Sequence, residues 1–188
     1  MINHSQNPQV LYSLQTLSDS LLTLMRDRPY EEITVSDICR KALITRKTFY
    51  RNCTSKKDLL CYAIDNAIRA QVAAVDWNVG SAKELYGQFF SYWKQKELLE
   101  ILCRQQMFEL FSERLVMISD SETKNRVFDR YTDGTDNPSH LRTYYNVLVI
   151  GALCQLLRAW IYFDYDLSPE EMARIMDFFD QEKTIDML

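Results

Sequence analysis

Apolar side chains recur every three or four positions in the first part of the chain, as they do on one face of an amphipathic helix. The repeat from Leu11 to Leu24 predicts a first helix over residues 8–27. Two short helices are expected next, over residues 35–42 and 46–52. A long helix followed by two short helices with a tight turn between them has the order of a helix-turn-helix unit.

Capping residues mark the starts of these helices. Thr34 is followed three residues later by Asp37, and Ser55 is followed three residues later by Asp58, which is the spacing of a cap and a carboxylate in the first turn. Thr45 stands directly before the third helix, where its hydroxyl can accept a backbone hydrogen bond. A fourth helix is expected to begin after Ser55 and to run to about residue 76.

Helical spacing continues toward the C-terminus. Ser81 with Glu84 predicts the start of a further helix. Residues 98–118 predict one or two apolar-rich helices, with a break near Arg104 and Gln105.

The last third of the chain begins with its clearest loop signal. The stretch TDGTDNPS at 132–139 predicts a loop, and a long helix is expected from Ser139 to about Tyr165. Ser168 predicts the start of the last helix, with Pro169 in its first position. One face of that helix carries an apolar stripe formed by Met172, Ile175, Met176 and Phe179.

The pattern predicts an all-α protein of two parts. The chain of 188 residues holds only four glycines and four prolines, fewer than a protein of strands and tight turns needs. We expect a helix-turn-helix domain over residues 1–55 and a larger helical domain over residues 77–188. The fourth helix, at about 56–76, bridges the two.

Charge is distributed unevenly between these parts. Residues 1–60 carry nine lysines and arginines against six acidic residues, whereas residues 61–188 carry 13 against 20. No acidic residue lies between Asp37 and Asp58, although that segment contains seven basic ones. A basic segment on a chain whose pI is about 5.3 indicates a local site for a polyanion.

The segment from Tyr30 to Leu60, YEEITVSDICRKALITRKTFYRNCTSKKDLL, resembles the DNA-binding part of the TetR family of bacterial transcription regulators. It shares with them the Ile-Thr-Val start, a Thr-Phe-Tyr recognition helix and a Ser-Lys-x-x-Leu-Leu opening of the next helix. It departs from the family pattern at Leu43, where a glycine is usual, and at Asn52 and Cys53, where His-Phe is usual. A β-carbon at Leu43 disfavours the positive φ that glycine adopts in such a turn.

The second domain resembles that of a TetR subgroup common in low-GC Gram-positive bacteria. The resemblance rests on a glycine within the long helix, a tryptophan nine residues later and the sequence SPEE at the start of the last helix. It implies a homodimer that binds an inverted-repeat operator in double-stranded DNA, and a repressor released by a small ligand. The alternative is a regulator without such a ligand, whose second domain binds a partner protein.

The resemblance and the major-groove geometry together assign the DNA-binding residues. The first turn of a recognition helix reaches base edges, and its flanks face phosphates. Arg46 can bind a guanine through two hydrogen bonds, and Lys47 can bind a guanine or a phosphate. By resemblance, Thr34, Tyr50 and Lys56 contact phosphates. The full predicted set is Thr34, Thr45, Arg46, Lys47, Thr48, Tyr50, Arg51 and Lys56.

Aromatic side chains at helical spacing in the second domain suggest a ligand pocket, with an ordinary hydrophobic core as the alternative. An apolar or aromatic effector would suit them, because no cation is placed for an acidic one. The predicted pocket residues are Tyr86, Phe89, Phe90, Trp93, Cys103, Met107, Phe108, Phe111, Tyr144 and Tyr145.

Other classes of protein are disfavoured. The longest uninterrupted apolar run, from Val147 to Cys154, is shorter than the roughly 20 residues that span a bilayer. The two histidines, His4 and His140, belong to no catalytic or metal-binding pattern, so we expect no enzyme, cofactor or metal site. The five cysteines form no C-x-x-C, and the N-terminus lacks the apolar core of a signal peptide. We therefore expect a cytoplasmic protein with reduced thiols, with a redox-sensing cysteine as the alternative.

Overall fold

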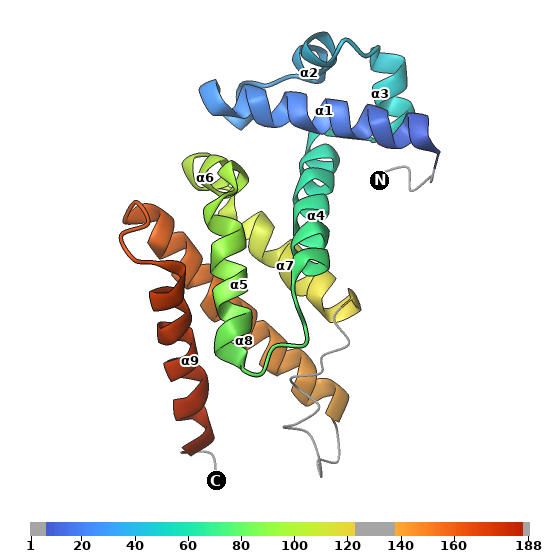
Figure 1. Ribbon diagram of the computed structural model, residues 1–188. Coiled ribbons are helices and arrows are strands. Elements are labelled where there is room, and N and C mark those ends of the chain that lie inside the picture. The colour runs from blue at the N-terminus through green and yellow to red at the C-terminus, as the bar shows by residue number, and fades with distance from the viewer. Residues whose placement is uncertain (1–6, 123–137, 186–188) are drawn as a thin grey trace.

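The computed structural model describes residues 7–122 and 138–185, and all regular structure in these ranges is helical. The first half of the fold lies at the top of Figure 1, with the fourth helix descending from it. Its elements are α1 (Pro8–Asp27), the 3-10 helix η1 (Tyr30–Glu32), α2 (Val35–Ala42), α3 (Arg46–Asn52) and α4 (Lys56–Ala74). The all-α prediction is confirmed, and the predicted bounds of the first three helices agree with the structure.

The caps form as the local sequence predicts. The Asp37 backbone N–H donates to the Thr34 hydroxyl at 3.1 Å, and the Thr34 N–H donates to the Asp37 carboxylate at 3.0 Å, which completes a capping box. Ser55 caps α4 by accepting from the Asp58 N–H at 3.0 Å. Each cap satisfies backbone donors that a helix leaves without partners in its first turn.

In the second half, the described residues form five helices. They are α5 (Ala82–Lys94), α6 (Glu97–Arg104), α7 (Phe108–Glu122), α8 (Pro138–Tyr162) and α9 (Pro169–Ile185). The predicted break is present between α6 and α7, where Gln106 adopts a left-handed φ of 56°. Most of the loop predicted at 132–139 lies outside the described residues.

The long helix α8 ends three residues earlier than predicted. Asp164 and Tyr165 both take left-handed backbone angles, with φ of 54° and 56°. The Tyr165 N–H donates to the Trp160 carbonyl at 2.8 Å, and the Trp160 indole N–H donates to the Leu167 carbonyl at 3.0 Å. These bonds form a turn that ends the helix at Tyr162, although the apolar residues continue at helical spacing beyond it.

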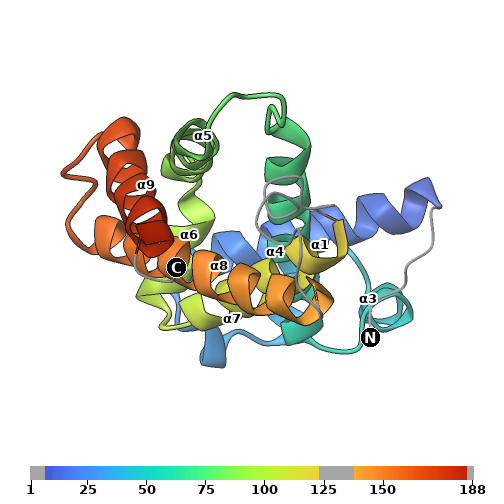
Figure 2. The ribbon, with the colours of Figure 1, turned by 90° about the horizontal axis from the view of Figure 1, so that it is seen from below.

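Helix α4 connects the two halves. It packs against α1, which also contacts α2 and α3, and against α7, which in turn packs on α8. The Arg114 guanidinium of α7 donates to both carboxylate oxygens of Asp65 on α4. Figure 2 shows α4 on the right of the molecule and the α5–α9 pair, which pack against each other, on the left.

The apolar stripe of α9 is divided between the core and the surface. Met172 and Met176 are buried, and their helix lies against α5. Ile175 and Phe179 remain exposed, as does Phe178. Helix α5 of the same chain therefore covers half of the stripe, and Ile175 and Phe179 form the part of it that stays on the surface.

One glutamine ties the end of α1 to the turn between α6 and α7. The Gln105 amide nitrogen donates to the Met25 and Arg28 carbonyls at 2.8 and 2.9 Å. Its amide oxygen accepts from the Tyr30 N–H at 2.8 Å. Beside it, Arg26 and Glu97 form a half-exposed ion pair at 2.6 Å. The side chain of Gln105 thereby supplies partners to three backbone groups around the α1–η1 link.

Replacing Gln105 by leucine should lower the free energy of unfolding by about 2 kcal/mol, because three backbone groups lose their partners in a part-buried position. Urea unfolding measures the change. Gln95→Leu is the matched control, since Gln95 is exposed and its side chain has no hydrogen bond among the described residues. Equal effects of the two changes would contradict the importance of these bonds.

Candidate nucleic-acid interface

Helix α3 presents a mixed cationic and aromatic face to solvent. Arg46, Lys47, Tyr50 and Arg51 are exposed, and their spacing places them on one side of the helix. Phe49 on the opposite side is fully buried. The core therefore fixes which face of α3 points outward. That face carries four of the five α3 residues that the sequence predicts to bind DNA.

The first turn of α3 is held by hydroxyl groups. The Thr48 N–H donates to the Thr45 hydroxyl at 3.2 Å, which caps the helix. The two threonine hydroxyls lie 3.1 Å apart, in hydrogen-bond contact with each other. The Arg46 guanidinium lies 5.9 Å from the centre of the Tyr50 ring, within the range of a cation–π contact. The helix start is thus ordered before any partner binds.

The turn between α2 and α3 adopts the glycine-like conformation without a glycine. Leu43 has φ of 55° and ψ of 34°, in the left-handed region. Its side chain is 93% exposed, so no packing holds it there. The Ile44 N–H donates to the Cys39 carbonyl at 3.0 Å, as in a helix that ends through a left-handed residue. The turn keeps this shape although the β-carbon makes it less favourable.

Charge on this surface is only partly balanced within the chain. Arg40 donates to Asp37 at 2.6 Å, and Arg28 lies 3.6 Å from the same carboxylate. Hydrogen bonds from Thr34, aided by these arginines, hold the pKa of Asp37 below its usual value. No described acidic residue pairs with Arg46, Lys47 or Arg51. The uncompensated positive charge is therefore concentrated on α3.

Lys56 has a structural role that its sequence position did not reveal. Its ammonium donates to the carbonyls of Tyr30, Glu31 and Ile33 at 2.6, 3.1 and 3.0 Å. It also lies 4.3 Å from the centre of the Tyr30 ring. An ammonium has three donors, and all three are in use. Phosphate contact by Lys56 stays a prediction. For the ammonium to bind a phosphate it must give up one of these carbonyls, or the Lys56 backbone N–H must bind the phosphate in its place.

Replacing Lys56 by methionine should lower the free energy of unfolding by about 2 kcal/mol, because charge-assisted hydrogen bonds to three carbonyls are lost. Lys57→Met, at the exposed neighbouring position, should change it little. Urea unfolding of both variants measures the effect.

The same variants test the phosphate prediction for Lys56. If Lys56→Met leaves stability unchanged but lowers the salt dependence of DNA binding by about one unit per half-site, its ammonium serves DNA binding rather than the fold. Lys57→Met supplies the reference slope for an exposed cation in the same turn.

A cavity of about 150 Å³ lies between α4, α5, α7 and α8. Of the predicted pocket residues, Tyr86, Phe89 and Tyr145 line it. Its other described walls come from Gln71, Val72, Val75, Trp77, Ala82, Leu85, Leu115, Ser119, Asn146, Val149, Ile150 and Leu153. The cavity therefore lies beside the predicted aromatic cluster rather than within it.

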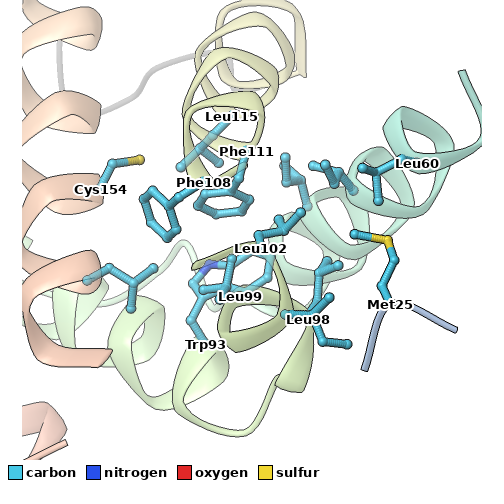
Figure 3. Close-up of a cluster of buried hydrophobic side chains, with 14 of the residues drawn as sticks. Met25, Leu60, Trp93, Leu98, Leu99, Leu102, Phe108, Phe111, Leu115 and Cys154 are labelled. Carbon is cyan, nitrogen blue, oxygen red and sulfur yellow. The ribbon is translucent and has the colours of Figure 1, made fainter. Parts of the chain in front are cut away.

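The other predicted pocket residues have different positions. Figure 3 shows Trp93 on α5 together with Phe108 and Phe111 on α7 in a closely packed core, and Phe90 is also fully buried. The Trp93 and Phe111 ring centres are 4.8 Å apart, at edge-to-face orientation. Cys103 and Met107 pack partly buried against this core, and Tyr144 is exposed. Much of the cluster is thus core, the alternative raised by the sequence.

Gln71 is a cavity residue that the sequence analysis did not select. It is buried on the face of α4 that also buries Ile64 and Ile68. A polar residue at a position where the helical period calls for an apolar one was the available signal.

All five cysteines are free thiols. Burial raises the pKa of each, to about 12 for Cys53 and about 11 for Cys154. The thiolate is the reactive form, so these environments disfavour oxidation at neutral pH. Among the described residues, no group of three or more histidine, cysteine or acidic side chains could hold a metal ion.

Comparison with known proteins gives a structural match and no sequence match. No protein-family model matches the chain, and no curated protein matches it. The fold is similar to the crystal structure of a TetR transcriptional regulator from Streptococcus agalactiae 2603V, with a TM-score of 0.63 and 16% identity. The match covers 93% of this chain and 96% of the other. The nearly complete coverage shows that this all-helical chain has a TetR-like fold.

Proposed function

We propose that this protein is a sequence-specific DNA-binding transcriptional regulator that reads its operator with α3. The observation that carries the proposal is the outward face of α3, which presents cations and a tyrosine that have no acidic partner among the described residues. Helix α3 is the second helix of the predicted helix-turn-helix, and a TetR-like fold for the chain supports its assignment as the recognition helix. Exposed positive charge of this kind matches the phosphates that flank the major groove.

Each residue of the proposed interface has a role that follows from its place. Arg46 and Lys47, with Thr45 and Thr48, lie in the first turn and are proposed to face base edges. Tyr50 and Arg51 lie farther along the helix and are proposed to face phosphates, as are Thr34 and Lys56 at the starts of α2 and α4. The Thr34 hydroxyl already donates a hydrogen bond to the Asp37 carboxylate, so contact with a phosphate would require it to give up that bond.

Replacing Arg46 by alanine should weaken operator binding by about 1–3 kcal/mol per half-site and relax the preference at particular base pairs. The loss on random DNA should be smaller, because most nonspecific affinity comes from phosphate contacts. Binding to operator and random duplexes at several salt concentrations measures both effects. Selection from random DNA supplies the operator.

Lys83→Ala is the matched control, because Lys83 is exposed on α5 in the other half of the fold. Both proteins must first show the wild-type helical content. If Arg46→Ala lowers the affinity for operator and random DNA equally, Arg46 does not contact base edges. No loss in either case would show that α3 is not the DNA-binding element.

We propose that the protein acts as a homodimer formed through α8 and α9. One continuous face of α8 is exposed, and it includes Tyr144, Val147, Leu148, Gly151 and Tyr162. Within α8 the segment Thr143–Tyr162 is, by length and composition alone, apolar enough to cross a membrane, yet only 28% of its apolar stretch is buried. We propose that the protein is cytoplasmic and that a second copy of the chain, rather than a membrane, covers this face.

Leu148→Asp should convert the dimer to a monomer at micromolar concentration, because a buried carboxylate without a partner opposes association. Leu11→Asp is the matched control, since Leu11 on α1 has a similar exposed fraction, 40% against 49%. Sedimentation velocity measures the mass. A wild-type monomer, or a dimer that persists in the Leu148 variant, would contradict an interface centred on α8.

A two-fold dimer presents two identical recognition helices, so the proposed operator is an inverted repeat with half-site centres roughly 34–36 Å apart. Regulation is proposed to be repression that a small ligand relieves, by binding unequally to the two arrangements of the recognition helices. The cavity beside α4 favours this form of control.

The alternative partner is a protein that binds the second domain. One observation favours it: a groove of about 560 Å³ lies between the α6–α7 turn and the end of α8, beside the exposed rings of Tyr162 and Phe163. Unchanged operator affinity across small molecules, together with a change on adding a co-purified protein, would select this alternative.

A further inference from the structure

One polar side chain of α4, that of Gln71, reaches the cavity from a largely buried position. Gln71 is 7% exposed, and it lines the cavity. No residue in ranges 7–122 and 138–185 hydrogen-bonds to its side-chain amide. Neither atom of the Gln71 amide is among the fully buried side-chain atoms without a hydrogen-bond partner, so solvent in the cavity reaches the amide, and a molecule that enters the cavity would have to replace that solvent as its hydrogen-bond partner.

The remaining walls define the class of molecule that fits. None of the described lining residues is aspartate, glutamate, lysine, arginine or histidine, so a charged ligand would be desolvated without compensation. A volume of about 150 Å³ corresponds to a molecule the size of benzene. The rings of Trp77, Tyr86, Phe89 and Tyr145 offer edges and faces to a small aromatic ligand.

We propose that this cavity binds a small neutral aromatic molecule with one hydroxyl group, of the phenol class, and that Gln71 hydrogen-bonds to the hydroxyl. An amide side chain both donates and accepts, and so does a hydroxyl, which makes the pair complementary in either direction. The apolar ring then occupies the space between α5 and α8. Specificity over benzene comes from Gln71, and specificity over anions of similar size comes from the uncharged walls.

The position of Gln71 also gives the ligand a route to the DNA surface. Gln71 is 15 residues after Lys56 on the same helix, a distance of about 22 Å at 1.5 Å per residue. The first part of α4 packs against α1 and its start holds η1 through Lys56. That ligand binding changes operator affinity rests on the proposed function, whereas ligand binding itself does not.

Titration calorimetry on the full-length protein without DNA tests the inference with three probes: phenol, benzene and benzoate. Phenol should bind about tenfold more tightly than benzene, the change expected from one buried hydrogen bond. Benzoate should not bind. Gln71→Met, which keeps the length of the side chain, should lower the affinity for phenol about tenfold and make it equal to that for benzene.

Two further variants keep the test decisive. Gln15→Met makes the same chemical change at an exposed position on α1, so it should leave phenol binding unchanged. Ala82→Leu adds volume to a cavity wall, so it should abolish binding of both phenol and benzene. If Gln71→Met does not fold, a folded Ala82→Leu protein that still binds phenol overturns the proposal.

Equal affinity of the wild-type protein for phenol and benzene overturns the proposal, and so does no binding of either. Unchanged phenol binding by folded Gln71→Met does the same. Operator binding by the wild-type protein is measured separately, so its loss counts against the proposed function alone. Intact operator binding without phenol binding counts against this inference alone.

Discussion

Burial of one face of α4 fixes the positions of both the α3 surface and the cavity. Leu60, Ile64 and Ile68 on that face are fully buried, between α1 on one side and α7 on the other. The ion pair between Asp65 and Arg114 fixes the same helix to α7 through two hydrogen bonds. Because α3 is held by α1 and the cavity is walled by α4, a shift of this one helix alters both surfaces.

Helix starts could be predicted because capping is local chemistry. Thr34, Thr45, Ser55 and Ser81 each accept a hydrogen bond from a backbone N–H three residues later, as their spacing predicted. The orientation of α3 followed in the same way, since a buried Phe49 leaves its cations outside. These features depend on neighbours within one or two turns, so the sequence contains them.

Features that depend on which helices meet could not be predicted. Spacing shows that Trp93 and Tyr86 point inward from α5, but only the positions of α7 and α8 decide which of them meets a core and which a cavity. Met172 is buried because α5 covers it. Lys56 reads as a free cation in the sequence, whereas the fold brings three carbonyls from residues more than 20 positions earlier to its ammonium. Such contacts follow from tertiary packing and leave no local pattern.

The bonds of Gln105 join segments that are 75 or more residues apart in the sequence. If the helix-turn-helix part opened alone, Gln105 would lose all three partners and the buried face of α4 would meet water. Opening one part is therefore coupled to opening the other, and the chain should behave as one cooperative folding unit rather than as two independently stable domains. The slowest-exchanging amide hydrogens of α1 and α6 would then report the same global opening event.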